Sequence, residues 1–249
     1  MRSRVKRALN VCLALLGYQP EQRETGFRAE ALSPFLGLLK RDGFAPRHII
    51  DVGANRGEWT RTALQTFPEA RYTLVEPQEG LQSYVRDLIA DGRKIEWIVA
   101  GVSDQRGTMR FTIAERDDSS TFALSEEEAR AAGLRQVPIA MRTLNEIAAT
   151  CGAPWPDLVK IDAEGLDLKV LAGASELLGK TDVFLVEAAV CAPLGNSVAE
   201  VMGRMGAAGY RLADITDLNR SAKFGVLWLC ELAFVRNGSG LLESIRSYE

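Results

Sequence analysis

Charged residues occur in this chain where a buried strand should end. Residues 157–165 read DLVKIDAEG, so Lys160, Asp162 and Glu164 alternate along an otherwise apolar run. Alternate side chains of a strand share one face, and buried charges are costly unless they are paired or bind something. We expect all three to point the same way, with Lys160 and Glu164 forming an ion pair that fixes the following turn. The rival interpretation is a set of solvated charges at a strand edge.

A glycine-rich turn follows an earlier strand-like run. Residues 51–57 read DVGANRG, and glycines at the carboxyl end of a strand let the backbone approach a ligand closely. The dinucleotide fingerprint G-x-G-x-x-G would need small residues where the chain has Asn55 and Glu58. Glu58 would also place a carboxylate at the helix N-terminus, where a pyrophosphate should sit. The turn therefore favours a ligand that puts no phosphate there.

An acidic residue, Glu76, closes the next strand-like run and is followed by Pro77. A carboxylate at this place can accept hydrogen bonds from both hydroxyls of a ribose. The alternative interpretation of Glu76 is a solvated side chain beside a tight turn. A glycine turn combined with an acidic residue that ends the second strand is typical of an S-adenosylmethionine site.

The elements that must position these residues alternate between strand and helix from His48 onward. The expected strands are residues 49–52, 71–75, 95–102, 109–114, 158–161, 183–186, 210–215 and 227–235. The expected helices are residues 58–67, 81–90, 166–178 and 198–205, with short helices opened by the capping-box pairs Ser125/Glu128 and Thr143/Glu146. This alternation predicts a parallel sheet with helices on both faces. The last connection is too short for a parallel crossover, so the C-terminal strand is expected to be antiparallel.

Composition narrows the classes of function. The 249 residues include 30 basic and 33 acidic side chains, for a formal net charge of −3, which gives no overall basic footprint for nucleic acid. No apolar run approaches the roughly 18 residues of a membrane span. Four separated cysteines argue against a disulfide framework or structural zinc, and favour a reducing, cytoplasmic compartment.

The N-terminal segment is treated as a separate helical extension, residues 1–47, before a catalytic domain at residues 48–249. Four basic residues within positions 2–7 precede an apolar stretch at 9–16. Asn10 interrupts that stretch, and no small-x-small cleavage site follows before Pro20, which argues against a signal peptide. We expect an amphipathic helix packed on the domain, with weak contact to an anionic membrane surface as the alternative.

Together these motifs resemble the FkbM family of S-adenosylmethionine-dependent methyltransferases. The turn at 51–57 is similar to the family's first motif, and residues 75–77 to its second-strand ending. Residues 160–165, KIDAEG, are similar to its most distinctive signature, and residues 102–104 and 231–236 also fit. One departure is Asn145, where an acidic residue is expected. The resemblance covers residues 48–236 and implies an α/β, Rossmann-like class I methyltransferase fold with a mostly parallel seven-stranded sheet and an antiparallel C-terminal strand.

The resemblance implies O-methylation of a hydroxyl on a sugar, polyketide or other secondary metabolite, with a small molecule or glycan as acceptor. Two other functions stay open: an S-adenosylmethionine-binding protein without catalysis, and an NAD-dependent oxidoreductase, which Asn55 and Glu58 disfavour. The expected residues around S-adenosylmethionine are Asp51, Gly53, Ala54, Asn55, Gly57, Trp59, Glu76, Pro77, Val102, Ser103 and Asp162.

The candidate catalytic residues are Asp162 and Glu187, which end neighbouring strands. An alcohol must lose its proton during methyl transfer, so a carboxylate can act as the base. The alternative role of Asp162 is contact with the cofactor. The two carboxylates could instead bind Mg²⁺ together, although no metal is expected.

His48 precedes the first strand, at the end of the sheet away from the cofactor, and a structural role is expected for it. The polar segments 117–121 and 214–224 are read as loops that could receive the acceptor.

Overall fold

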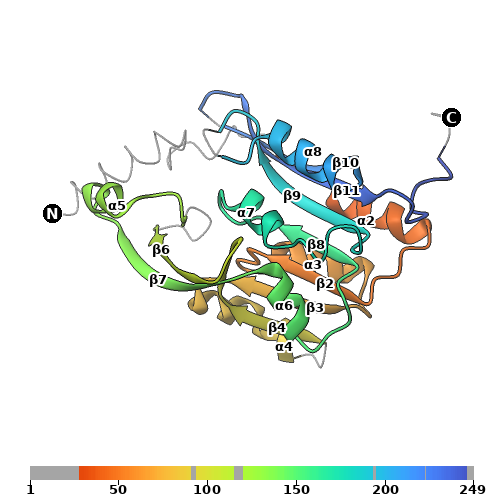
Figure 1. Cartoon of the computed structure of the whole chain (residues 1–249), viewed down its shortest axis with the longest axis horizontal. Coiled ribbons are helices and arrows are strands. Elements are labelled where there is room, and N and C mark those ends of the chain that lie inside the picture. The colour runs from red at the N-terminus through yellow and green to blue at the C-terminus, as the bar shows by residue number, and fades with distance from the viewer. Residues whose placement is uncertain (1–27, 91–93, 115–119, 193–194, 222, 246–249) are drawn as a thin grey trace.

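The computed structural model describes residues 28–90, 94–114, 120–192, 195–221 and 223–245. An eight-stranded sheet crosses this part of the chain in the order β1-β10-β11-β9-β8-β2-β3-β4 (Figure 1). Its strands are β1 (Arg28–Glu30), β2 (His48–Val52), β3 (Arg71–Glu76), β4 (Ile95–Val99), β8 (Leu158–Ile161), β9 (Val183–Ala189), β10 (Tyr210–Arg220) and β11 (Leu227–Arg236).

The strand directions confirm the expected fold. The neighbours β4, β3, β2, β8 and β9 pair in parallel, whereas β11 runs antiparallel to β9. The antiparallel C-terminal strand is therefore confirmed. β10 completes the seven strands that were expected, and β1 adds an eighth by pairing with β10 at the edge of the sheet. The topology is that of a Rossmann-like class I methyltransferase.

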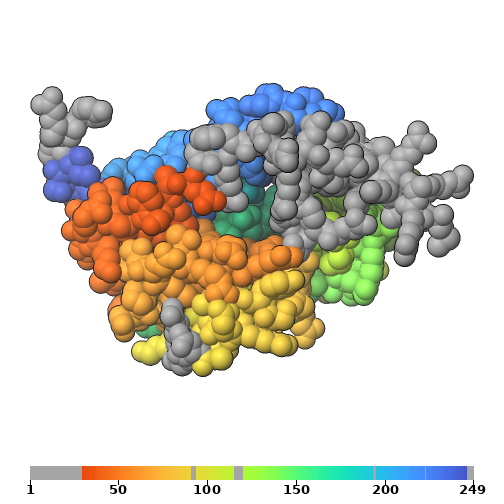
Figure 2. All heavy atoms as spheres, turned by 180° about the vertical axis from the view of Figure 1, so that it is seen from behind, coloured from red at the N-terminus to blue at the C-terminus, as the bar shows by residue number. Residues whose placement is uncertain are grey.

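Helices cover both faces of this sheet, as the alternating pattern predicted. On one face lie α2 (Leu32–Arg41) and α3 (Glu58–Thr66), whose buried side chains pack against apolar residues of β2, β8 and β9. Figure 2 views the molecule from this side, with the red and orange residues of α2 and α3 in front of the sheet. The 3₁₀ helix η1 (Glu79–Val85) and α4 (Arg86–Ala90) follow β3 and add Val85 and Leu88 to the same cluster.

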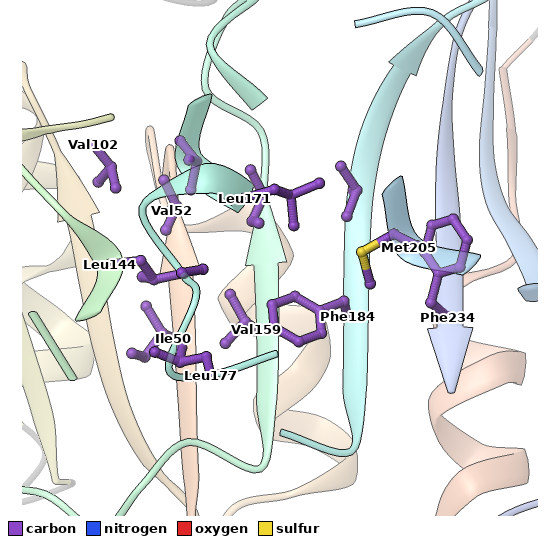
Figure 3. Close-up of a cluster of buried hydrophobic side chains, with 14 of the residues drawn as sticks. Ile50, Val52, Val102, Leu144, Val159, Leu171, Leu177, Phe184, Met205 and Phe234 are labelled. Atoms are coloured by element: carbon purple, nitrogen blue, oxygen red, sulfur yellow. The ribbon is translucent and has the colours of Figure 1, made fainter. Parts of the chain in front are cut away.

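The second core cluster fills the opposite face. The helices α6 (Leu144–Thr150), α7 (Asp167–Ala172) and α8 (Val198–Ala207) cover it. Figure 3 shows Val159 and Phe184 side by side on β8 and β9, with Leu171 and Met205 brought onto them by helices. Because β2, β8 and β9 are covered on both faces, their side chains are buried almost without interruption. This rigid centre fixes the carboxyl ends of the strands.

A separate three-stranded sheet extends away from the main one (Figure 1). It contains β5 (Gly101–Val102), β6 (Gly107–Ile113) and β7 (Arg135–Arg142), and α5 (Glu126–Ala132) precedes β7. The expected single strand over 95–102 is therefore wrong, because the chain leaves the main sheet after Val99. β7 was not predicted. It contains Pro138, a residue that demotes a run to an edge strand, and β5 pairs with β7 only at Met141 and Arg142.

Capping boxes set the start of three helices. Ser125 with Glu128 and Thr143 with Glu146 make the reciprocal bonds predicted for α5 and α6, and Ser197 with Glu200 makes the same bonds at the start of α8. α7 is shorter than expected and ends at Ala172, and Gly173 follows it where a Cβ would lie 2.2 Å from the carbonyl oxygen of Ser103.

The predicted N-terminal helix falls largely within residues 1–27, outside the described residues. Residues 28–41 form β1 and α2, both in contact with the sheet. No helix in the described ranges combines the length and apolar character that crossing a bilayer requires.

Candidate active site at the carboxyl ends of β2, β3 and β8

The glycine turn after β2 packs directly on the end of β8. Gly53 has a φ of 72°, and a Cβ there would lie only 1.8 Å from the carbonyl oxygen of Asp162. Asn55 and Gly57 also have positive φ values, 45° and 79°, before α3 begins. A side chain at position 53 would therefore push the two strand ends apart, and this is the physical reason for glycine in the first motif.

Glu76 connects the end of β3 to the same turn. Its carboxylate is 4% exposed and accepts hydrogen bonds from the backbone N–H groups of Asn55, at 2.9 Å, and Gln78, at 3.0 Å. Burial raises the pKa of the Glu76 carboxyl, although these backbone bonds oppose the shift. Each carboxylate oxygen has a second lone pair. Glu76 is thus held in one orientation beside the turn and retains capacity to accept hydroxyl donors.

Lys160 lies between two carboxylates. Its Nζ is 3.3 Å from Asp51 Oδ1 and 3.3 Å from Asp162 Oδ2, and its side chain is 5% exposed. Among the described residues these carboxylates are its ion partners, so the expected pair with Glu164 is wrong. Register explains the difference: Asp51 lies opposite Lys160 in the parallel pairing of β2 and β8, whereas Glu164 belongs to the turn beyond β8 and has a φ of 52°.

The two carboxylates differ in exposure. Asp51 is fully buried and also accepts a hydrogen bond from Thr60 Oγ1 at 2.6 Å, so it joins β2 to α3. The Asp162 side chain is 36% exposed, and its backbone N–H donates to the carbonyl of Val52. Of the pair, Asp162 is the carboxylate that a ligand can reach.

The other predicted cofactor residues lie in differing environments. Val102 and Ser103 are buried at β5 and just after it, where Ser103 Oγ donates to Asp104. Ala54 is buried in the turn, and Trp59 packs against the α2/α3 core. Pro77 follows Glu76 and is only partly buried.

Glu187 is joined to β8 through a buried hydrogen-bond network that sequence reasoning missed. Asn196 Nδ2 donates to Asp167 Oδ2, at 2.8 Å, and to the carbonyl of Glu187, at 3.3 Å. Asp167 Oδ1 accepts from the N–H of Ala163, at 2.9 Å, at the start of α7. Burial raises the pKa of Asp167 to about 6, and burial with three neighbouring acids raises that of Glu187 well above its usual range. This network joins the residue that follows Asp162 to the end of β9.

Glu231 is a second residue missed from the sequence. It lies directly opposite Glu187 in the β9–β11 pairing, and its Oε1 accepts a hydrogen bond from Thr216 at 2.5 Å. Burial raises the pKa of Glu231 to about 7, against the lowering effects of Thr216 and Lys160. The available signal was a lone acid in the apolar run LWLCELAFV.

The remaining predictions concern His48 and the two polar segments. His48 is buried, its ring nitrogens 2.7 Å from the carbonyl of Pro154 and 3.0 Å from Thr73 Oγ1, and burial lowers its pKa. The proposed loop at 214–224 is wrong, because β10 continues to Arg220. Residues 117–119 lie outside the described residues, while Thr121 Oγ1 donates to the carbonyl of Glu164.

Asn145, which departs from the family pattern, joins α6 to the turn that follows α7. Its N–H donates to the carbonyl of Gly173, and its side chain forms hydrogen bonds with the hydroxyl of Ser175 and the N–H of Glu176.

No group of three His, Cys, Asp or Glu side chains in the described ranges has the arrangement of a metal site.

The donor set fits S-adenosylmethionine. Because Gly53 and Gly57 carry no side chain, the glycine turn packs closely on the carbonyl of Asp162 and on Val85, and Glu76 beside it offers oriented acceptors for ribose hydroxyls. Asp162 supplies a partly exposed carboxylate on the neighbouring strand. These features lie at the carboxyl ends of parallel strands, where open α/β sheets bind their ligands.

Comparison with known proteins agrees with this reading. The profile of the family described as "Methyltransferase FkbM domain" matches residues 51–212. The 2-O-methyltransferase NoeI of Sinorhizobium fredii (strain NBRC 101917 / NGR234) is 26% identical over 156 residues, covering 56% of this chain and 62% of the relative. This chain therefore spans less than two thirds of that protein.

Solved structures with similarity to the chain include two methyltransferases. Precorrin-6y C5,15-methyltransferase from Geobacter metallireducens GS-15 has a TM-score of 0.46 and 12% identity, covering 89% of this chain and 98% of that one. Magnesium protoporphyrin IX methyltransferase (ChlM) from Synechocystis PCC 6803, with bound SAM, has a TM-score of 0.46 and 14% identity, covering 83% and 78%.

The family match covers well over half of the chain, from the β2 turn through the KIDAEG segment to β10. The chain belongs to the FkbM family of methyltransferases, and its cofactor is S-adenosylmethionine.

Proposed function

We propose that the protein is an O-methyltransferase that transfers the methyl group of S-adenosylmethionine to a hydroxyl of a sugar, polyketide or other secondary metabolite. The observation that carries this proposal is Asp162, a partly exposed carboxylate held by Lys160 beside the glycine turn. The similarity to NoeI, a 2-O-methyltransferase, supports a hydroxyl as the methyl acceptor.

Three parts of the site would hold the cofactor. Glu76 accepts the ribose hydroxyls, the turn from Gly53 to Gly57 provides backbone surface, and Asp162 lies on the neighbouring strand. When bound, S-adenosylmethionine supplies an electrophilic methyl group on a positively charged sulfur. The chain then has to place an acceptor oxygen in line with that group, and such positioning is worth up to about 7–11 kcal/mol in favourable cases.

A base must also accept the proton of the acceptor hydroxyl. Methyl transfer from bound S-adenosylmethionine to the acceptor oxygen would release the hydroxyl proton. Asp162 is proposed to receive it, because this carboxylate is exposed while Asp51, the other partner of Lys160, is buried. Glu187, on the adjacent strand, is proposed to assist from the same edge of the sheet.

The test combines binding with turnover. Titration calorimetry should show binding of S-adenosylhomocysteine and no binding of NAD, and the reverse result would favour an oxidoreductase. Incubation with methyl-labelled S-adenosylmethionine and a panel of sugar, phenol and polyketide alcohols, with amines and thiols tested beside them, should label at least one acceptor on oxygen. Binding without any labelled product from amines, thiols or alcohols would instead support a binding protein without catalysis, and labelling of nitrogen alone would refute O-methylation.

A further inference from the structure

Lys160 makes more contacts than an ion pair needs. Besides the carboxylates of Asp51 and Asp162, its ammonium donates to the carbonyl of Gly53, at 2.9 Å, and to that of Val52, at 3.3 Å. These four groups belong to two segments, the end of β2 with its turn and the end of β8. One buried cation therefore joins both sides of the candidate cofactor site.

The charge of Lys160 is maintained despite its burial. Desolvation lowers the pKa of the ammonium, but Asp162, Asp51 and Glu231 outweigh that effect and raise the pKa overall. The side chain is thus a permanent cation on a strand that is otherwise apolar. A buried ion pair is weak evidence for stability, because packed apolar residues of similar volume often stabilise a protein as well or better. Stability alone does not explain a lysine here.

The geometry offers a different explanation. Backbone at Gly53 lies against backbone at Asp162 with no side chain between them. The carbonyl of Val52 also accepts the N–H of Asp162, but without the ammonium the carbonyl of Gly53 and the carboxylate of Asp162 would lie near each other as a partial and a full negative charge. Lys160 neutralises this repulsion and holds both oxygen atoms toward one point. Asp51 is in turn fixed by Thr60, so the orientation of the ammonium is determined from α3 as well.

We propose that Lys160 is a positioning residue of the methyltransferase site, which sets the shape of the Gly53 turn and the orientation of Asp162 for the cofactor. It acts through those two groups and does not touch the reacting atoms. This proposal rests on the proposed function, since it assumes that the turn binds S-adenosylmethionine. It predicts that Lys160 contributes to cofactor affinity beyond its contribution to folding.

The experiment uses the full chain and S-adenosylhomocysteine as the probe, measured by titration calorimetry, with melting temperature recorded on the same samples. Lys160→Met leaves Asp51 as an unpaired buried charge and can fail to fold for that reason alone. The decisive variant is therefore Asp51→Asn with Lys160→Met, which is neutral and nearly equal in volume. Thr181→Val is the matched control, because Thr181 is also fully buried and its hydroxyl donates to the carbonyl of Pro156, outside the candidate site.

The double variant is expected to fold and to bind S-adenosylhomocysteine at least about tenfold more weakly than the wild type. Thr181→Val is expected to melt earlier with unchanged affinity. A double variant that binds like the wild type would overturn the positioning role and leave the buried pair with a structural one. A double variant that does not fold would also overturn it, because the pair would then be required for stability. Failure of the wild type to bind the probe would instead refute the proposed function.

Discussion

Glu187 and Glu231 lie directly opposite each other in the antiparallel pairing of β9 and β11. Burial raises the pKa of both carboxyls, that of Glu231 to about 7, and the charge of Asp162 adds to both shifts. Lys160 opposes both shifts through its charge. The two carboxyls therefore hold fewer than two negative charges near neutral pH, and a proton is retained beside Asp162.

The Glu231→Gln variant is expected to change how stability depends on pH. The ordinary pKa of a glutamate is 4.5 and that of folded Glu231 is about 7, so between these values the native state keeps a proton that the unfolded chain has released. The wild type should therefore lose stability as pH rises from 4.5 through 7. The variant lacks this loss, and its free energy of unfolding should exceed that of the wild type by roughly 1–3 kcal/mol at pH 8, with little difference at pH 4.5.

Urea denaturation at pH 4.5, 6 and 8 checks this expectation. Glu69→Gln, at an exposed position, is the control and should follow the wild type at each pH. Parallel pH profiles for the wild type and Glu231→Gln would show that Glu231 titrates normally in the folded protein.

Replacement of Glu76 should weaken cofactor binding. Glu76→Ala removes the ribose acceptors and also leaves the N–H groups of Asn55 and Gln78 without their partner. Because a hydrogen bond to a charged group is worth about 1.5–3 kcal/mol, affinity for S-adenosylhomocysteine should fall about tenfold or more. Glu76→Gln keeps one acceptor oxygen and should lose less. Titration calorimetry on the folded variants measures these affinities. Unchanged affinity in Glu76→Ala would mean that the ribose binds elsewhere.

The residues that could be predicted share one property: their role depends on their own segment of chain. Glu76 ends a strand that the local pattern identifies, Gly53 directly follows another, and Asp162 follows a strand with an unusual charge pattern. Parallel strands then bring their carboxyl ends together without further information. The local pattern does not give the order of the strands in the sheet, and that order was expected from the family resemblance.

The residues that could not be predicted depend on register between distant strands. Glu231 faces Glu187 because β11 pairs with β9 at one particular offset, and a shift of one residue would turn it to the other face. Asn196 reaches Asp167 across 29 residues of chain. The Lys160–Asp51 pair depends in the same way on the β2–β8 pairing. The expectation of a local partner, Glu164, was wrong for this reason.

Gly53→Ala should disrupt the site through a steric clash. A Cβ at this position would lie 1.8 Å from the carbonyl oxygen of Asp162, and the φ of 72° adds backbone strain. Gly152→Ala is the matched control, since its φ is 61° but nothing lies within 4 Å of the added Cβ. The control should lose about 1–2 kcal/mol of stability from strain alone, and Gly53→Ala should lose more and bind S-adenosylhomocysteine weakly or not at all. Equal losses in both variants, with binding retained, would contradict the close packing of β2 on β8.

Asp162→Asn distinguishes the possible roles of the exposed carboxylate. The amide keeps the shape and one acceptor oxygen for Lys160 but accepts a proton poorly. If Asp162 is the base, turnover should fall by roughly 10²–10⁴ while affinity for S-adenosylhomocysteine stays nearly unchanged. We expect this result, because Asp162 is the exposed partner of Lys160.

Asp182→Asn is the control. Asp182 has a similar exposure and pairs with Arg236, outside the candidate site, so its replacement should affect the melting temperature and leave turnover intact. A loss of affinity at least as large as the loss of rate would assign Asp162 to cofactor binding. Early melting with both functions lost would assign it to the support of Lys160, and wild-type values for all three measurements would remove it from the site.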